Sequence, residues 1–220
     1  MGHPYWPLFD LRVRTPRIEL RYPDDDDVVA LAALAAKGIH PPDFMPFAVP
    51  WSTAPSPKLE RESIQHYWKS RGEFTPAKWG VPFATVVGGE LVGTQAVHAA
   101  DFVVTRAVES GSWLGQAHQG QGIGTEMRAA MLHFAFAGLG AQIAYSGAWH
   151  DNAASLGVSK ALGYRTNGDR IMPRLDKPAR MINLKLTRAT WEKHRRDDIV
   201  IEGLDACLDL FGLVGDPAVA

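Results

Sequence analysis

The chain lacks the residues and patterns that several classes of protein require. It has one cysteine, Cys207, which excludes intramolecular disulfides and cysteine-based metal cages. No apolar run approaches the roughly 20 residues of a membrane span, and the N-terminus lacks a basic-then-apolar secretory pattern. We therefore expect a soluble, cytoplasmic protein that needs neither a membrane nor a metal.

An excess of charge of either sign is also missing. Lys and Arg number 23 and Asp and Glu number 24, so nothing in the total charge indicates a dedicated nucleic-acid or membrane binder. The run Asp24 to Asp27 precedes an alanine-rich stretch, where we expect it to cap a helix, since adjacent carboxylates on a helix point to different sides. With 220 residues and 46% hydrophobic content, the chain suits a single domain.

What the chain does have is a glycine-rich turn, within the stretch from Gly111 to Phe136. The turn lies between an expected strand and a long amphipathic helix, and it contains Gly115, Gly120, Gly122 and Gly124. Glycine permits backbone angles closed to residues with a Cβ and lets a ligand lie against the main chain. Free N–H groups of the helix's first turn and the helix dipole then attract anions. The stretch predicts a phosphate-binding turn.

The spacing of this turn distinguishes among known phosphate-binding loops. Thr125 and Glu126 follow Gly124, where a P-loop needs Lys and Ser or Thr. The third glycine has the wrong spacing for a dinucleotide fingerprint, which argues against a nucleotide-binding oxidoreductase. The spacing that the turn does match is Gln-x-x-Gly-x-Gly, with Gln119, Gly122 and Gly124 at the named positions. A strand, turn and helix packed for structural reasons alone is the alternative interpretation.

Further blocks occur in the same order and at the same separations as in a known family. They are Trp113-Leu114-Gly115, Gly122 to Glu126, Asp151 to Ser155, and Leu162-Gly163-Tyr164, preceded by Thr15 to Arg21. Over about residues 11 to 187 the chain resembles the GNAT acyltransferase superfamily, in particular the RimJ/RimL-type branch that acetylates ribosomal-protein N-termini. The whole chain is also similar to bacterial GNAT proteins described as succinyl-CoA transferases.

The resemblance implies an α/β (α+β) fold. A mixed, mostly antiparallel central sheet with splayed central strands would be flanked by helices. Residues 1–10 would form an N-terminal segment, residues 11–187 the acyltransferase domain, and residues 188–220 a C-terminal extension that packs on the domain or on a dimer partner. We expect a homodimer or a higher homo-oligomer.

Hydrophobic periodicity and turn residues place the individual elements. We expect strands at 11–22 with a bend at Thr15-Pro16, 81–87, 91–98, 109–116, 142–149 and 181–186, and helices after Asp24, at 58–71, after Gly124 and at 152–162. Residues 38–57 carry six prolines amid aromatic residues. This loop either forms one wall of an acceptor pocket or seals the core.

The resemblance also implies the binding residues for an acyl-CoA donor, either succinyl-CoA or acetyl-CoA. The expected cofactor-binding residues are Leu114, Gln119, Gly120, Gln121, Gly122, Ile123, Gly124, Thr125 and Asn152. The main-chain N–H near Leu114 would stabilise the oxyanion of a tetrahedral intermediate. Asn152 would bind the pantetheine arm, and it also suits the N-cap of the following helix.

The expected reaction is direct attack of an amine on the thioester. Many family members place a tyrosine acid where this chain has Ser159, so Ser155 or a water would assist the leaving thiol, whose pKa near ~8.5 makes the need small. Glu109 is the first candidate for the general base; the others are Asp101, His98 and His118.

The function predicted is acyl transfer to a primary amine of a protein N-terminus, a lysine or a small molecule. A non-catalytic acyl-CoA-binding regulator is the alternative, supported by the missing tyrosine. Whole-chain similarity favours succinyl-CoA over acetyl-CoA, and a succinyl carboxylate would need a polar or basic partner. The candidates for that partner are His40, Lys78, His98 and Arg106.

Overall fold

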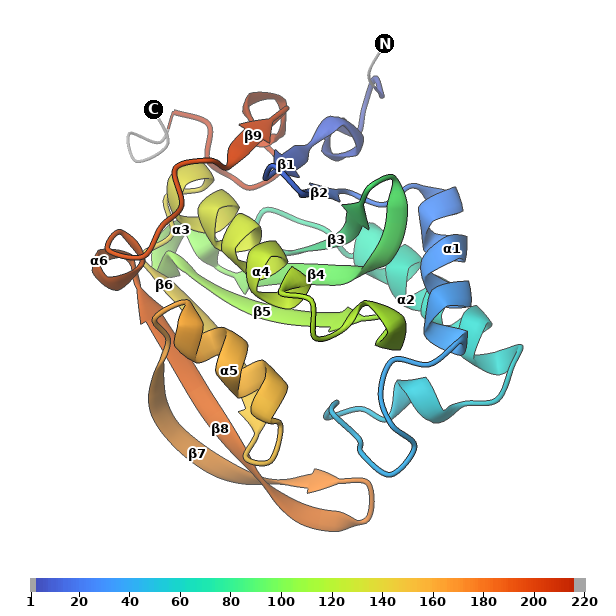
Figure 1. Cartoon of the computed structure of the whole chain (residues 1–220). Helices are drawn as coiled ribbons and strands as arrows, with labels where there is room; N and C mark the ends of the chain where they lie inside the picture. The colour runs from blue at the N-terminus through green and yellow to red at the C-terminus, as the bar shows by residue number, and fades with distance from the viewer. Residues whose placement is uncertain (1–2, 216–220) are drawn as a thin grey trace.

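A single sheet runs through the molecule in the computed structural model, which describes residues 3–215 (Figure 1). Its strands have the order β7-β8-β6-β5-β4-β3-β2-β1-β9. They are β1 (Arg12–Arg14), β2 (Ile18–Arg21), β3 (Lys78–Val87), β4 (Glu90–Ala100), β5 (Ala107–Leu114), β6 (Ile143–Trp149), β7 (Arg165–Arg174), β8 (Lys177–Thr187) and β9 (Val200–Glu202).

The helices are α1 (Asp25–Ala36), α2 (Lys58–Gly72), α3 (Phe102–Thr105), α4 (Ile123–His133), α5 (Ala153–Ala161) and α6 (Arg188–Trp191). One turn of π-helix, Phe134–Gly138, prolongs α4. None of the helices in the described part of the chain is long and apolar enough to cross a membrane.

Strands β5 and β6 form the only parallel pair among the described strands, and they separate early. Their pairing covers Ala107 with Ile143, Val108 with Ala144, and Glu109 with Tyr145. All the other neighbouring strands are antiparallel. The predicted fold, a mostly antiparallel sheet with splayed central strands and flanking helices, is confirmed.

Side chains alternate across β5, so this strand faces both helical layers. Trp113 packs with the cluster of Val28, Leu31 and Tyr67, which belong to α1 and α2. Leu114 points to the other face, where a Cβ on Gly124 of α4 would lie 3.8 Å from Leu114 Cδ1. Helices α1 and α2 therefore cover one face of β5, and α4 covers the other.

The start of α1 confirms the capping interpretation of the aspartate run. Asp24 Oδ1 accepts a hydrogen bond from the main-chain N–H of Asp27 at 2.8 Å, and Asp24 is the N-cap. The buried Asp27 carboxylate in turn accepts from Arg21 Nε at 2.9 Å and Nη2 at 2.6 Å. This ion pair joins α1 to β2.

One expected strand needs correction, and two strands were not expected from the sequence. Residues 11–22 form two paired strands, β1 and β2, because the chain reverses at Thr15 and Pro16 rather than merely bending there. Strand β7 is an edge strand whose residues are mostly exposed, so it carries no apolar alternation that could reveal it. Strand β9 is short and completes the opposite edge by pairing with β1.

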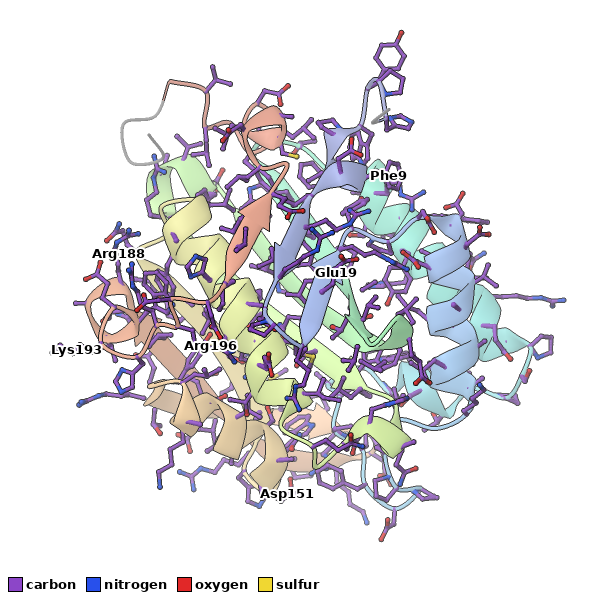
Figure 2. All side chains as sticks on the ribbon, turned by 45° about the horizontal axis from the view of Figure 1, so that its top comes forward. Phe9, Glu19, Asp151, Arg188, Lys193 and Arg196 are labelled. Atoms are coloured by element: carbon purple, nitrogen blue, oxygen red, sulfur yellow. The ribbon has the colours of Figure 1, made fainter. Side chains whose placement is uncertain are left out.

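Residues near the end of the described part of the chain pack on the main hydrophobic core. Phe211 and Leu213 are fully buried in the main hydrophobic cluster. Phe211 contacts Trp79 with ring centroids 4.9 Å apart and Phe134 with centroids 6.0 Å apart. Elsewhere in the sheet, Glu19 of β2 forms an ion pair with Arg14 of β1, with the Arg14 Nε and Glu19 Oε2 atoms 2.9 Å apart (Figure 2).

A buried carboxylate holds the first turn of α4 to the N-terminal strands. Glu126, 9% exposed, accepts hydrogen bonds from Thr15 Oγ1 at 2.6 Å and Arg17 Nε at 3.0 Å. Arg196, labelled in Figure 2, approaches the oxygen that Thr15 also contacts, Oε1, at 3.6 Å. A carboxylate at this end of the helix also interacts favourably with the helix dipole.

We predict that Glu126→Gln lowers the free energy of unfolding by about 1.5–3 kcal/mol, because charged hydrogen bonds to Thr15 and Arg17 are lost in a buried place. Urea unfolding measures the change. Glu73→Gln is the control, since Glu73 pairs with Lys69 at 3.7 Å on the surface and should cost less than about 0.5 kcal/mol. Equal effects of the two substitutions would contradict the anchoring role.

Candidate active site

The end of β5 presents a main-chain N–H, that of Leu114, to the gap between β5 and β6. Gly115 N donates to Val92 O of β4 at 2.9 Å. Because N–H directions alternate along an antiparallel strand, the N–H of Leu114 points away from β4. No residue of β6 pairs with β5 beyond Glu109 in the described chain. The Leu114 N–H therefore faces a gap that is open to an extended ligand.

The glycine turn lies at the open end of this gap. Gly120 and Gly122 have φ of +73° and +77°, which favours glycine at both positions. Gly122 is the N-cap of α4 and supplies no side-chain cap, so the N–H groups of the first helical turn are available to an anion. The expected requirement for special backbone angles is wrong for Gly115 and Gly124, whose φ values are not positive.

The other predicted residues of the turn mostly brace it. Gln119 Nε2 donates to Ile39 O at 2.8 Å and to Leu114 O at 3.0 Å. Gln121 Nε2 donates to Ala117 O at 2.9 Å. The Ile123 side chain is buried, so only its main chain can contact a ligand. Thr125 is half-buried in the first turn of α4.

Asn152 and Ser155 lie just beyond the end of β6. Asn152 Oδ1 accepts from Ser155 N at 3.1 Å, which confirms Asn152 as the N-cap of α5. Its contact with the pantetheine arm stays a prediction. Ser155 is half-buried in the first turn of α5, and its carbonyl accepts from Ser159 Oγ at 2.9 Å.

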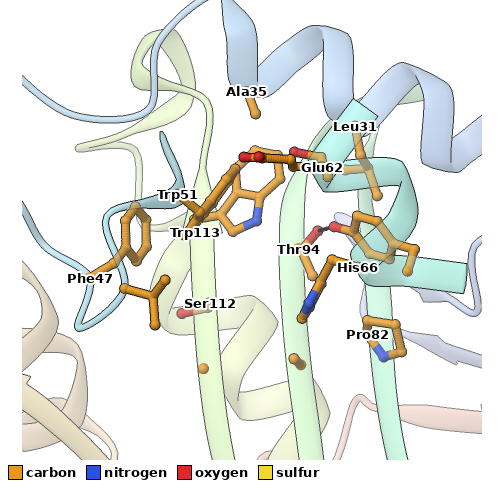
Figure 3. Close-up of a pocket in the computed structure, with 15 residues that line it drawn as sticks. Leu31, Ala35, Phe47, Trp51, Glu62, His66, Pro82, Thr94, Ser112 and Trp113 are labelled. Atoms are coloured by element: carbon orange, nitrogen blue, oxygen red, sulfur yellow. Dashed lines mark hydrogen bonds between the residues drawn. The ribbon is translucent and has the colours of Figure 1, made fainter. Parts of the chain in front are cut away.

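A cavity of about 360 Å³ lies on the opposite face of β5, under α1 and α2 (Figure 3). Its lining is largely aromatic and aliphatic: Leu31, Ala35, Phe47, Val49, Trp51, Glu62, Ser63, His66, Tyr67, Pro82, Thr94, Ala96, Gly111, Ser112 and Trp113. The Tyr67 and Thr94 hydroxyls are 2.8 Å apart, and burial raises the pKa of Tyr67 to about 12.

The proline-rich loop forms one wall of the cavity and also packs on the core. Phe47 and Trp51 line the cavity, and the Trp51 ring lies 6.0 Å from the Trp113 ring. The same two residues pack against the buried cluster that contains Ala35 and Ile39. The loop therefore seals part of the core and also lines a cavity; that this cavity receives the acceptor stays a prediction.

Two titratable residues that line the cavity were not predicted as site residues from the sequence. Glu62 and His66 lie one turn apart on α2, and both line the cavity. Partial burial lowers the pKa of the His66 imidazole below its usual value, and the charge of Lys69 adds to this effect. Their four-residue spacing could have revealed a shared face. Trp68, on the same helix, is 54% exposed.

The predicted bases lie outside the cavity lining. Glu109 is exposed on β5, directly opposite His98 on β4. Burial lowers the pKa of His98, while Glu109 raises it. Asp101 is the N-cap residue of α3, and His118 approaches Glu90 at 3.7 Å. Of these groups, His118 lies near the end of β5, since a Cβ on Gly115 would be 3.2 Å from its Cδ2.

The predicted partners of a succinyl carboxylate also lie away from the cavity. His40 Nε2 is 2.7 Å from Ser52 Oγ, Lys78 is exposed at the start of β3, and Arg106 lies over the Phe102 ring. Among the residues that line the cavity, His66 is the only basic one. No group of three or more His, Cys, Asp or Glu residues could hold a metal ion in the described chain.

A buried arginine that the sequence reasoning missed lies on the α4 side of the gap. Arg128 is 4% exposed. Its Nη1 donates to Ser159 Oγ of α5 at 2.9 Å, and its Nη2 donates to Ser112 Oγ of β5 at 3.1 Å. Arg128 lies between the buried residues Met127 and Ala129 of α4. A basic residue within an apolar stretch of a helix was the feature of the sequence that could have pointed to it.

Comparison with known proteins relates this arrangement to one family. A family model described as "Acetyltransferase (GNAT) domain" matches residues 17–165. RimJ of Mycobacterium smegmatis in complex with CoA-disulfide has 16% identity and a TM-score of 0.66, over 92% of this chain and 95% of that chain. RimL, the ribosomal L7/L12 α-N-protein acetyltransferase in complex with coenzyme A, has 20% identity and a TM-score of 0.64, over 79% and 95%.

A third similar structure is a spermidine N-acetyltransferase SpeG chimera from Vibrio cholerae and human sequences. It has 14% identity and a TM-score of 0.63, and the match covers 80% of this chain and 98% of that chain. At these identities the three structures show a shared fold.

We predict that Gly122→Val weakens CoA binding about tenfold or more. A β-branched residue at this positive φ forces the turn to change, and its side chain blocks close approach to the main chain. Calorimetry with CoA measures the affinity. Gly88→Val is the matched control, because Gly88 has φ of +57° with open space around it in the β3–β4 turn. Unchanged CoA affinity in folded Gly122→Val would place the phosphates elsewhere.

Proposed function

Because the chain belongs to the GNAT acetyltransferase domain family, we propose that it is an acyl-CoA-dependent N-acyltransferase acting on a primary amine. The observation that carries this proposal is the position of β5 between two binding regions. The glycine turn and α4 lie on one face, and the cavity reaches Gly111, Ser112 and Trp113 from the other. The Leu114 N–H lies at the edge between them.

The proposed reaction is direct attack. An amine in the cavity forms a bond to the thioester carbon, the carbonyl oxygen becomes an oxyanion, and the Leu114 N–H stabilises it by roughly 3–4 kcal/mol. The C–S bond then breaks and the electron pair leaves with the CoA sulfur. Ser155 is proposed to assist this step, although a thiol with pKa near ~8.5 leaves readily without help.

The one cysteine of the chain is not suited to act as the nucleophile that would form a covalent acyl-enzyme intermediate. Cys207 is buried, and burial raises the pKa of its thiol to about 12, with Asp209 and Asp10 adding to the effect. Its Sγ donates to Gly203 O at 3.3 Å. Only a thiolate is an effective nucleophile, so this residue supports direct attack on the thioester.

The acceptor amine must lose a proton before or during attack. At neutral pH, deprotonation of a lysine side chain, with a pKa of ~10.4, costs ~4 kcal/mol. Deprotonation of an α-amino group, with a pKa of ~8, costs less than about 1 kcal/mol. Of the groups in the cavity, the His66 imidazole is suited to accept the proton, because its lowered pKa keeps it neutral. We propose His66 as the base, and Glu109 as the second candidate.

The donor, acceptor and cellular context remain proposals as well. The sequence favours succinyl-CoA over acetyl-CoA, and His66 is the one basic residue among those that line the cavity. A protein N-terminus, a lysine and a small amine all fit the chemistry. A homodimer or higher homo-oligomer and a cytoplasmic location stay predictions from the sequence.

We predict that the purified protein acylates an amine. Incubation with acetyl-CoA or succinyl-CoA and a panel of amines should yield acylated amine by mass spectrometry, with an equal amount of free CoA by a thiol assay. Binding of acyl-CoA without turnover of any amine would instead support the alternative, a non-catalytic acyl-CoA-binding regulator, for which the serine at position 159 is the supporting feature.

The role of His66 predicts a particular pH profile. If neutral His66 accepts the proton, kcat/KM rises with pH through the imidazole pKa, which lies below its usual value of about 6.5, and then levels off. His66→Gln should lower kcat/KM about a hundredfold. The rise of kcat/KM with pH should then occur at the pKa of the acceptor amine. Glu109→Gln is the comparison variant. A profile altered only by Glu109→Gln would assign the base to Glu109.

A further inference from the structure

The cavity under α1 and α2 has the size and layout of a pocket for one small group. Its volume of about 360 Å³ lies within the roughly 300–1,000 Å³ of small-molecule pockets. Leu31 and Tyr67 are buried and form its interior. Glu62 and His66 also line it and are partly exposed on α2, so they mark its opening. The titratable groups thus lie where the cavity meets solvent, and apolar groups lie inside.

Three aromatic side chains form a continuous wall of this cavity. Phe47 and Trp51 come from the proline-rich loop and Trp113 comes from β5, and Figure 3 shows them next to one another. The ring centroids of Phe47 and Trp51 are 5.4 Å apart, and those of Trp51 and Trp113 are 6.0 Å apart. Aromatic rings attract further rings at centroid distances of about 4.5–7 Å. The wall is therefore suited to contact a flat aromatic group.

Three of the four hydroxyl groups that line the cavity already have a partner. The Tyr67 and Thr94 hydroxyls are 2.8 Å apart, and Ser112 Oγ accepts from Arg128 Nη2 at 3.1 Å. The buried Ser63 Oγ is the one without a hydrogen-bond partner among the described residues. A polar group that enters such a place gives up hydrogen bonds to water and regains few of them. A peptide backbone or a sugar ring therefore fits the interior poorly.

The charges of the lining suit an acceptor with a single positive charge. Glu62 is the one acid among the described residues that line the cavity, and its Oε1 atom lies 3.7 Å from Lys58 Nζ on the surface. A polyamine carries several ammonium groups, and each needs a partner when it leaves water. A monoamine has one, and His66 is the proposed acceptor of its proton.

We propose that the acceptor is a primary monoamine whose nitrogen is joined through a short linker to an aromatic group. This inference rests on the proposed function and names the class of its acceptor. The aromatic group lies against Trp51 and Trp113, and the amine points to the β5 side of the cavity at Ser112. The amine nitrogen bonds to the acyl carbon, one proton passes to His66, and the CoA thiolate leaves. A free arylalkylamine and a protein N-terminus with an aromatic first residue share this chemistry.

The first test measures kcat/KM of the wild type for 2-phenylethylamine, ethylamine and spermidine. Acetyl-CoA or succinyl-CoA is the donor, and release of CoA is the signal. Because 2-phenylethylamine and ethylamine share the amine and the linker, their ratio isolates the ring, whose burial should favour 2-phenylethylamine about 10- to 100-fold. Spermidine should also fall below it. Equal values for 2-phenylethylamine and ethylamine, or a higher value for spermidine, would overturn the inference, and this arm needs no variant to fold.

The second test alters the aromatic wall. Trp51→Ala should raise KM for 2-phenylethylamine about tenfold or more, because a ring contact is lost, while kcat and the KM for ethylamine stay within about threefold. Trp51→Phe should retain part of the preference. Trp68→Ala is the matched control, since Trp68 is 54% exposed on α2 and lies outside the cavity lining. An equal loss for both amines in Trp51→Ala would overturn the contact between Trp51 and the acceptor.

Peptides distinguish the two sources of the aromatic amine. A higher kcat/KM for the peptide Phe-Ala-Gly than for 2-phenylethylamine would assign the group to a protein N-terminus, and the reverse order would assign it to a small amine. A preference for Ser-Ala-Gly over both would overturn the aromatic class and leave acyl transfer standing.

Calorimetry with 2-phenylethylamine and CoA-loaded protein separates this inference from the acyltransferase proposal. Binding that Trp51→Ala weakens, without turnover of any amine, would overturn the acyltransferase proposal and leave the aromatic site standing. Turnover of other amines, with no binding of 2-phenylethylamine, would do the opposite.

Discussion

The separation of β5 from β6 after Glu109 is the constraint on which the candidate site depends. Two parallel strands that stayed paired would satisfy each other's main-chain groups and leave nothing for a ligand. Here the pairing ends at Tyr145, and helices packed above the sheet keep the gap in place. Gln119 ties the glycine turn to the end of β5, Glu126 ties α4 to the N-terminal strands, and Asn152 begins α5.

The local chemistry of this arrangement could be read from the sequence, because it depends on residues close together in the chain. The positive φ of Gly120 and Gly122 and the capping by Asp24 and Asn152 each follow from one residue and its near neighbours. Strand β7 could not be read in this way, since its residues are exposed and it is defined by pairing with β8.

The parts of the site that the sequence did not reveal depend on distant contacts. Arg128 is buried between β5 and α5, and only the fold shows that its neighbours are hydroxyls rather than carboxylates. His66 and Glu62 lie on a helix for which the sequence analysis predicted no role in the site, and they line a cavity together with residues of the proline-rich loop. Glu109 was chosen for its position on the central strand, but its side chain emerges at the exposed part of that strand.

The pairing of β9 with β1 has a consequence for how the chain is made. Arg14 and Glu202 form an ion pair across this edge although 188 residues separate them in the sequence. During synthesis from the N-terminus, β1 leaves the ribosome long before its partner β9 does. An uncovered strand edge can pair with other chains, so the nascent protein carries an aggregation hazard at β1 until β9 has also been made.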